Sequence, residues 1–322
     1  MKPVPRLKQF LCLVGVLLAI TSCAQLGDPP TVHPLVGKVW DVAARRFVDP
    51  AVVIERATAA RFVLLGEIHD NAEHHRIQLR ILDDVLRNGR RPALVLEQYD
   101  IDQQEQLNAQ TQDKAEDRAL HGLENLMRKG WNWAYYEPIL SAGLRQKLEL
   151  IAANLSRETL REVTHKGYEA LGAGSEARLK IEAVWSSERQ QQLLHDVALG
   201  HCGKLPEHVV PMIAKSQRAR DAVMADMLLK SKQEGGIALF GRGHARYDMG
   251  VPLYLAAREP NASLLSVGLI EVDTPTDPAA YARGSLGAQH DYLWFTKRAS
   301  RQSDPCDSIP AKPKALWAAA GL

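Results

Sequence analysis

The feature of this sequence that most restricts its fold is a series of short apolar runs, each ending at a glycine or a polar residue. Residues 62–65 end at Gly66, and residues 93–96 end at Glu97. Runs this short and this apolar are typical of buried strands. Between these two runs, apolar residues keep helical spacing until the stop signal Asn-Gly at 88–89. Strand, helix and strand over this length predict one right-handed βαβ unit.

Further runs of the same kind extend the pattern along the chain. They cover residues 148–153, 237–240, 264–272 and, as a short edge strand, 293–295. The stretches at about 102–147 and 156–232 are helical in pattern. We therefore predict an α/β domain over residues 36–299: a mostly parallel sheet flanked by helices on both faces, with the two helical insertions forming a smaller all-helical cap subdomain.

Length and charge exclude some classes of protein. The chain has 322 residues, enough for a sizeable core, and its 46% hydrophobic and 24% charged content is that of a globular protein. The net charge of +2 includes three basic residues and no acid among the first 22 residues, so the remaining 300 carry +2 − 3 = −1. This excludes a nucleic-acid partner bound through overall positive charge.

The N-terminal segment has the pattern of a targeting signal. Lys2, Arg6 and Lys8 precede an apolar run at 10–20, which is too short to span a bilayer and fits a secretory signal peptide. Ile-Thr-Ser-Cys at 20–23 resembles the lipobox of bacterial lipoproteins.

This resemblance implies how the chain would be anchored. We expect residues 1–22 to be a lipoprotein signal peptide, Cys23 to carry palmitate and other acyl chains, and 23–35 to be a lipidated tether. Ala24 resembles the outer-membrane-sorted pattern, which predicts a lipid anchor in the bacterial outer membrane with the domain facing the periplasm. The alternative is an ordinary signal peptide with an incidental cysteine.

The C-terminal half of the chain holds two further cysteines and a proline-rich tail. After removal of Cys12 and acylation of Cys23, only Cys202 and Cys306 remain, and two cysteines leave open whether they pair. Three prolines after residue 300 predict a loose tail over 300–322.

Polar residues with useful chemistry follow the predicted strands. Glu67 and His69 follow the first, Glu97 ends the second, and His244 follows the fourth, behind Gly241. Because ligands of parallel sheets bind beyond the carboxyl ends of the strands, we expect a shared cleft there.

The cleft allows several readings. One is a hydrolase in which a glutamate and an imidazole activate water. A divalent metal is a further possibility, although the consecutive His74 and His75 cannot both aim at one ion beside His69. No H-E-x-x-H, G-x-S-x-G or Walker pattern occurs. The plain alternative is a non-catalytic envelope scaffold whose polar residues only satisfy turns.

Several motifs, in order, resemble those of the ChaN-like haem-binding lipoproteins. They are Leu-Gly-Glu-Ile-His-Asp-Asn at 65–71 with His74-His75, Ala-Ala-Asn at 152–154, Ala-Arg-Asp-Ala at 219–222 with Met-Ala at 224–225, Gly-Arg-Gly-His at 241–244, Gly-Val-Pro at 250–252 and Asp-Tyr-Leu-Trp-Phe-Thr at 291–296. The resemblance covers about residues 36–297.

That resemblance implies a parallel sheet with a smaller helical subdomain and haem held between two monomers. Each iron is bound by one tyrosine, and a histidine and a lysine of the partner hold propionates. At greater distance the chain resembles Tiki proteases, TraB-like proteins and erythromycin esterases, whose Gly-x-x-His motifs and paired glutamates fall on Gly66–His69, Gly241–His244, Glu67 and Glu97.

The family's tyrosine cannot be placed by motif alone. We rank Tyr168 first, between helical segments of the predicted cap, and Tyr247 next, just beyond the Gly-x-x-His turn. His201 and Lys204 suit propionates, because cations bind carboxylates strongly. The prediction is thus a dimeric haem-binding envelope lipoprotein for haem or iron acquisition, with the hydrolase and the non-catalytic scaffold as alternatives; whether the chain is an enzyme stays open.

Overall fold

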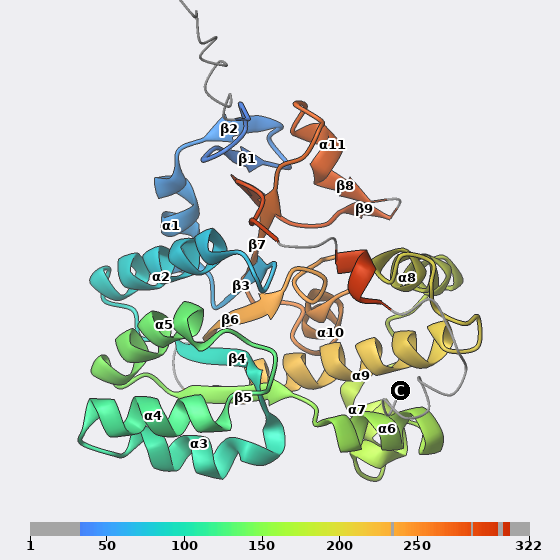
Figure 1. Cartoon of the computed structure of the whole chain (residues 1–322), viewed down its shortest axis with the longest axis horizontal. Helices are drawn as coiled ribbons and strands as arrows, with labels where there is room; N and C mark the ends of the chain where they lie inside the picture. Colours follow the sequence, from blue (N-terminus) through green and yellow to red (C-terminus); the bar gives the residue numbers. More distant parts are fainter. Residues whose placement is uncertain (1–32, 233–234, 285, 302–304, 310–322) are drawn as a thin grey trace, which may run out of the picture. The chain divides into compact units, whose positions relative to one another are not determined.

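An eight-stranded sheet runs through the middle of the domain. The computed structural model describes residues 33–232, 235–284, 286–301 and 305–309, so Cys23 and the predicted signal peptide lie outside the described residues. The strand order is β2-β1-β10-β7-β3-β6-β4-β5 (Figure 1). The bounds are β1 Val39–Asp41, β2 Arg46–Val48, β3 Phe62–Glu67, β4 Ala93–Asp100, β5 Leu150–Asn154, β6 Gly236–Gly241, β7 Leu264–Glu271 and β10 Tyr292–Thr296. The strands from β10 to β5 are all parallel, so the predicted α/β class is confirmed.

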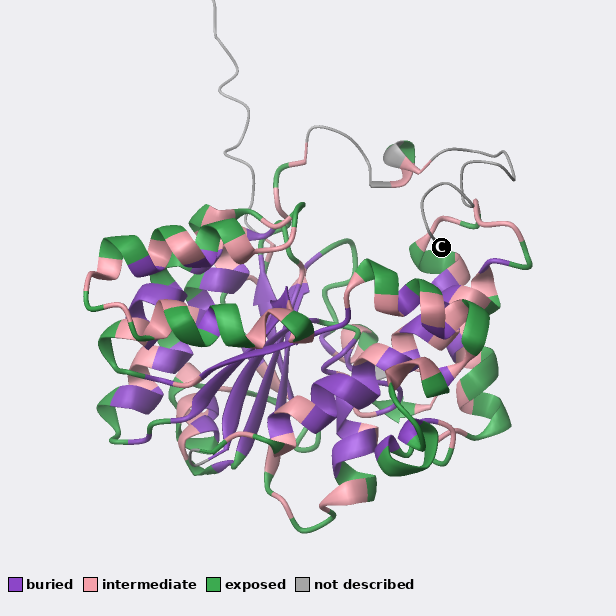
Figure 2. Ribbon diagram, turned by 90° about the horizontal axis from the view of Figure 1, so that it is seen from below, coloured by how far each residue is buried: buried purple, intermediate pink, exposed green. Residues whose placement is uncertain are grey.

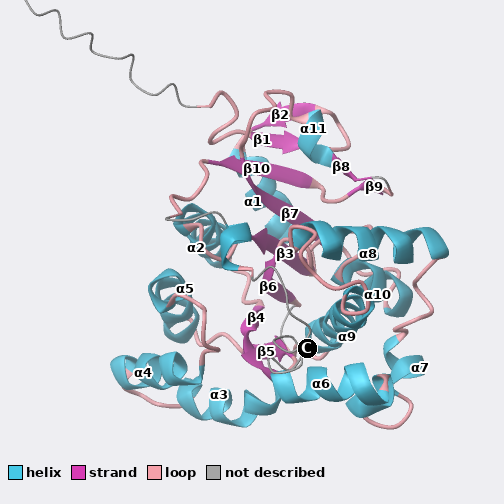
Figure 3. Cartoon of the chain, turned by 45° about the vertical axis from the view of Figure 1, so that its right-hand side comes forward, coloured by secondary structure: helices cyan, strands magenta, loops and turns pink. Residues whose placement is uncertain are grey.

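Helices cover both faces of this sheet (Figures 1 and 3). One layer holds α1 Pro50–Ala59, α2 Ala72–Arg87, α3 Gln104–Thr111, α4 Glu116–Leu126 and α5 Trp133–Arg145. The other holds α6 Arg157–Lys166, α7 Ser175–Leu179, α9 Val210–Leu229 and α10 Val251–Arg258, with α8 Ser187–Gly200 packed on α9. Shorter elements are η1 Ile101–Gln103, η2 Tyr168–Leu171, α11 Ala279–Ala282, the two-residue strands β8 Arg283–Gly284 and β9 Gly287–Ala288, and η3 Pro305–Ser308.

The two predicted helical insertions therefore differ in position. The first becomes α3 to α5 on one face of the sheet, and the second becomes α6 to α9 on the other. The first insertion follows β4 and the second follows β5. Only α8 and the start of α9 share a small apolar cluster of their own.

Alternation along the strands explains why both faces need a helical layer. In β3, Phe62 and Leu64 pack into one core cluster, while Val63 and Leu65 pack into the other. Successive strand residues point to opposite faces, so an entirely apolar strand must be covered on both. Figure 2 shows the sheet as the most continuously buried part of the domain.

The N-terminal hairpin was not expected from the sequence. β1 pairs antiparallel with β10, so β10 is an interior strand and the prediction of an edge strand at 293–295 is wrong. Strands of three residues, such as β1 and β2, are too short to show periodicity in the sequence.

Described residues after 300 are bound to the rest of the domain. Arg301 makes ion pairs with Asp70 and Glu271, and Cys306 forms a disulfide with Cys202 across a Cα separation of 5.8 Å. The expected looseness of this tail therefore does not apply to Arg301 and Cys306. Within the described residues, no helix is both long and apolar enough to cross a membrane.

Candidate functional site

The carboxyl ends of neighbouring strands bring the predicted polar residues together. Glu67 ends β3, Glu97 lies in β4 and Gly241 ends β6. A Cβ atom on Gly241 would lie 2.9 Å from Cε1 of His69 and 3.5 Å from Oε2 of Glu97, so the ring and the carboxylate flank this glycine closely. We call Glu67, His69, Glu97, Asp221 and His244 the Glu–His cluster.

The first half of the cluster centres on a buried carboxylate. His69 Nδ1 donates to Glu67 Oε1 at 2.9 Å, and Tyr136 and Gln78 also donate to this carboxylate, at 2.5 and 2.6 Å. Burial alone raises the pKa of Glu67, but the hydrogen bond from His69 and the neighbouring imidazoles lower it overall. The Glu67 side chain is 0% exposed, whereas that of His69 is 47% exposed and contacts Trp131. This imidazole is held by a fixed carboxylate and still reaches solvent.

The same hydrogen bond shifts the titration of His69 itself. Burial lowers the pKa of His69, but Glu67 and the charge of Glu97 raise it above the ordinary value overall. With Nδ1 donating to Glu67, Nε2 is the atom left for a ligand or for proton transfer. It makes no hydrogen bond that we find among the described residues.

The second half of the cluster is entirely buried. His244 Nδ1 donates to Asp221 Oδ1 at 2.6 Å, and Nε2 lies 3.5 Å from Glu97 Oε1. The backbone N–H of Gly241 donates to Glu97 Oε2 at 2.7 Å. Burial opposes a charged imidazole, but the two carboxylates outweigh it and raise the pKa of His244 to about 10. The pKa of Glu97 falls below its usual range because His244 and Gly241 outweigh the effect of burial. His244 is therefore an imidazolium between two acids at neutral pH.

Three residues of this site were missed in the sequence, and a fourth, His75, was considered there only as a metal ligand. Asp221 comes from α9, Tyr136 from α5, and both Gln78 and His75 from α2. Asp221 lies within one of the family-like motifs, which was a usable signal. His75 also lies within one of these motifs. Tyr136 and Gln78 come from helix faces whose contacts with Glu67 depend on packing, so no local pattern indicates them.

His74 and His75 do not share a metal ion. His74 Nδ1 accepts from the backbone N–H of Ile68 at 2.9 Å and Nε2 donates to Thr296 Oγ1 at 2.8 Å, while burial lowers the pKa of His74 to about 4. His75 instead lies 3.3 Å from Glu67 and donates from Nε2 to the carbonyl of His69. Among the residues that the structure describes, no group of three or more His, Cys, Asp or Glu side chains is arranged to hold a metal ion.

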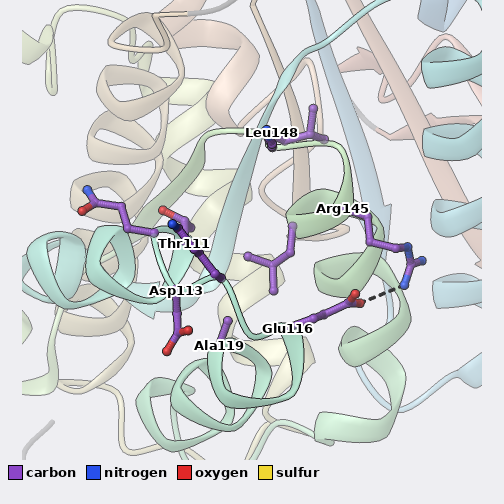
Figure 4. Close-up of a pocket in the computed structure, with 10 residues that line it drawn as sticks. Thr111, Asp113, Glu116, Ala119, Arg145 and Leu148 are labelled. Carbon is purple, nitrogen blue, oxygen red and sulfur yellow. Dashed lines mark hydrogen bonds and ion pairs between the residues drawn. The ribbon is translucent and has the colours of Figure 1, made fainter.

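Two of the cavities among the described residues lie at ends of the strands. The one in Figure 4 measures about 490 Å³ and is lined by residues 111–114, 144, 145, 147 and 148 among others, near the start of β5. The Glu116–Arg145 ion pair is drawn across it, and no predicted site residue lines it. The second, of about 520 Å³, is lined by residues 70–73, which follow β3, and by Tyr135 and residues 294–300. We call the second one the edge cavity, because its lining residues follow the carboxyl ends of β3 and β10.

Comparison with known protein families identifies the family of this chain. Residues 53–255, well over half of the chain, match the family described as haem-binding uptake, Tiki superfamily, ChaN. The chain belongs to this ChaN family. Family and fold together point to a haem-binding, uptake-related function.

One solved structure shares the fold of this ChaN-family chain. The ChaN of Campylobacter jejuni, described with cofacial haem binding, superposes with a TM-score of 0.64 at 20% identity, covering 80% of this chain and 95% of that one. An erythromycin esterase mutant matches more distantly, with a TM-score of 0.42 at 12% identity over 79% of this chain and 81% of its own.

A curated relative comes from a plant. Protein RETICULATA-RELATED 5, chloroplastic, of Arabidopsis thaliana is 25% identical over 313 residues, which covers 86% of this chain. The chain spans only 38% of the length of that relative.

The tyrosines predicted for this ChaN-family chain have engaged hydroxyls. Tyr168 is 6% exposed within the core, and burial, followed by its hydrogen bond to Glu182, raises its pKa. Tyr247 donates to Asp291 Oδ2 at 2.7 Å, beside the amino-terminal ends of β7 and β10. Tyr247 thus lies away from the carboxyl edge, although it is only three residues from His244.

The predicted propionate partners lie together, near the disulfide. His201 Nδ1 donates to the carbonyl of Val197 at 2.7 Å, and Lys204 Nζ donates to the carbonyls of Cys306 and Ile309. In the described part of the chain, no hydrogen bond, ion pair or ring contact joins either residue to Tyr168 or Tyr247.

Proposed function

We propose that this protein binds haem and serves haem or iron acquisition in the bacterial envelope. The observation that carries the proposal is membership of the ChaN family over residues 53–255. The shared fold with the Campylobacter protein, whose description names cofacial haem, supports the same conclusion. A homodimer formed with haem is part of the proposal.

The envelope location is the second element of this proposal. It rests on the signal-like segment at 1–22 and on acylation of Cys23, with the anchor in the outer membrane and the domain in the periplasm. The Cys202–Cys306 disulfide supports an exported protein, since such bonds persist in oxidising compartments.

Haem binding is tested by titrating hemin into the purified protein beginning at residue 24. The expected result is a shifted Soret band that saturates with protein concentration, and an increase in mass on size exclusion. A hemin spectrum that does not change on addition of the protein contradicts the proposal. Tyr168→Phe tests the predicted ligand, because an unchanged spectrum removes Tyr168 as the iron ligand.

Lipidation has a separate test. The full chain expressed in a Gram-negative bacterium should incorporate labelled palmitate and fractionate with the outer membrane. Cys23→Ser should abolish both, and incorporation that persists in this variant contradicts acylation at Cys23.

A second function, ester or amide hydrolysis, is favoured by the Glu–His cluster. In this reading His69 is the acid–base group: Glu67 fixes its Nδ1, and Nε2 accepts a proton from water that attacks the substrate and returns it to the leaving group. Turnover of model p-nitrophenyl esters should then disappear in His69→Asn and persist in Tyr281→Phe, a distant control. Equal rates in wild type and His69→Asn contradict the hydrolase.

A further inference from the structure

One cation beside the Glu–His cluster makes no contact that accounts for its charge. Arg220 lies on α9 directly before Asp221, and its Nε atom is buried without a hydrogen-bond partner among the described residues. We also find no ion pair of this guanidinium in the described part of the chain. Buried polar atoms in folded proteins are normally paired. Because the residue is partly exposed, a ligand from solvent can reach it.

The charged neighbours of Arg220 already have other partners. The charges that act on its guanidinium are those of Glu97, Asp221, Asp100 and Arg128. The first two both contact His244, and the last two form an ion pair with each other. A guanidinium whose role was to neutralise these acids would pair with one of them. Arg220 is therefore available to an anion that comes from outside the chain.

The carboxylate of Glu97 lies between this cation and the exposed imidazole of the cluster in the electrostatic sense. Its charge acts on both His69 and Arg220. A Cβ atom on Gly241 would lie 3.5 Å from Glu97 Oε2 and 2.9 Å from the His69 ring, so these two side chains are close neighbours. Nothing lies within 4 Å of the Cβ position of Gly243, so the turn after β6 leaves open space here. The free imidazole nitrogen and the free guanidinium thus lie around the same carboxylate.

The charge of the surroundings favours a ligand with a single negative charge. The Glu–His cluster contains three carboxyl groups and two imidazoles, so it adds little excess positive charge to that of Arg220. A phosphate dianion would be repelled by these acids. A carboxylate has one charge, and its two oxygens match the paired N–H groups of a guanidinium.

We infer that Arg220 and His69 form a binding site for a small molecule with a carboxylate, in which Arg220 binds the carboxylate and His69 contacts a polar group next to it. For the second proposed function, the substrate is then an ester or amide that also carries a carboxylate. The inference rests on that function for turnover alone, and the proposed haem binding plays no part in it.

The test measures binding independently of turnover, on the protein beginning at residue 24. Monomethyl succinate has one ester and one carboxylate, dimethyl succinate lacks the charge, and methyl phosphate carries the competing anion. Each probe is titrated while the ring resonance of His69 is followed by NMR, and this resonance is assigned from its loss in His69→Asn.

Two variants of Arg220 and one control separate a built site from general attraction. Arg220→Gln removes the charge, and Arg220→Lys keeps it without the paired N–H groups. Arg298→Gln is the control, because Arg298 is exposed and makes no ion pair within the described residues. It follows β10, which β7, β3 and β6 separate from β4.

Monomethyl succinate should shift the His69 resonance saturably and bind about tenfold more tightly than dimethyl succinate. Arg220→Gln should remove this advantage and leave the affinity for dimethyl succinate unchanged. Arg220→Lys should weaken monoester binding by about threefold, because a lysine keeps the charge but not the two parallel hydrogen bonds. Arg298→Gln should change neither affinity.

Equal affinities for the monoester and the diester overturn the inference, as does monoester binding that Arg220→Gln leaves unchanged. Equal losses in Arg220→Gln and Arg298→Gln also overturn it. If Arg220→Gln does not fold, an unchanged monoester affinity in Arg220→Lys has the same meaning. Tighter binding of methyl phosphate than of monomethyl succinate overturns the assignment to a carboxylate.

Hydrolysis is measured separately, with mono-p-nitrophenyl succinate and p-nitrophenyl acetate. Faster turnover of the succinate ester, lost in Arg220→Gln through a higher KM, supports both the site and the hydrolase. If neither ester is hydrolysed while monoester binding depends on Arg220, the second proposed function fails and the carboxylate site is supported.

Discussion

The two halves of the Glu–His cluster have the same chemistry and opposite exposure. In the first, Glu67 holds an imidazole, His69, whose side chain is 47% exposed. In the second, Glu97 and Asp221 hold His244, and all three side chains are no more than 8% exposed. The first half can meet a ligand, and the second cannot without opening of the fold.

This difference shows that a carboxylate–imidazole pair does not by itself indicate an active group. His244 carries its proton to about pH 10, so it acts as a fixed charge that ties α9 to β4. His69 has a free nitrogen and a raised pKa without full burial, so it can exchange protons with a bound molecule. The buried half supports the structure that positions the exposed half.

Among the variants considered, Glu97→Gln should lower the free energy of unfolding the most. Removing one partner of a buried ion pair costs about 3–5 kcal/mol, because the remaining charge loses its compensation. Urea unfolding should show this as a lower midpoint with an unchanged m value. Glu259→Gln is the matched control, since Glu259 pairs with Arg61 on the surface and its loss should cost at most about 1 kcal/mol. Equal losses in the two variants contradict the division of roles.

The next largest loss of stability should come from alkaline pH, which removes the proton from His244 in the buried half of the Glu–His cluster. The pKa of His244 rises from 6.5 to about 10 on folding, so its stabilisation is fully present below pH 6.5 and is lost as pH rises through 10. We expect the free energy of unfolding to fall by about 4 kcal/mol between pH 6.5 and 10 for this group. Urea titrations of wild type and His244→Gln over that range isolate the effect, and parallel slopes in the two proteins contradict it.

Much of this arrangement could be predicted from the sequence. Strand runs that end in Glu67, Glu97 and Gly241 are local signals, and the rule that parallel strands share a carboxyl edge is general. The juxtaposition of His69 with Glu97 follows from these two facts, without any knowledge of side-chain packing.

The other parts of the site could not be predicted, because they depend on contacts between segments that are distant in the sequence. Asp221 reaches His244 only because α9 packs on the sheet, and Tyr136 reaches Glu67 only because α5 packs on α2. The exposure of His69 against the burial of His244 also has no local signature, since both follow a Gly-x-x-His turn. The neighbours Tyr135 and Tyr136 also differ without a local signal: Tyr135 lines a cavity, whereas Tyr136 donates to the buried Glu67 carboxylate.

Gly241→Ala should lower the free energy of unfolding by less, and it tests the contact between the exposed and buried halves of the Glu–His cluster. The added Cβ would lie 2.9 Å from the His69 ring, so the ring or the strand must shift. Overpacking of this kind costs about 1–3 kcal/mol, and the low value is expected because the His69 ring can move toward solvent. Gly243→Ala is the matched control, since nothing lies within 4 Å of its Cβ position. The His69 resonance in NMR should shift in the first variant and not in the second.

The smallest effect on stability should come from His69→Ala. A half-exposed side chain whose carboxylate partner keeps other donors should cost about 1 kcal/mol or less, well below Glu97→Gln. Glu67 retains hydrogen bonds from Tyr136 and Gln78 when the imidazole is removed. If the hydrolase reading holds, this nearly neutral variant should nevertheless lose all ester turnover. A loss of stability as large as that of Glu97→Gln would instead show that His69 is a structural group like His244. The exposed and buried halves of the Glu–His cluster would then have the same role.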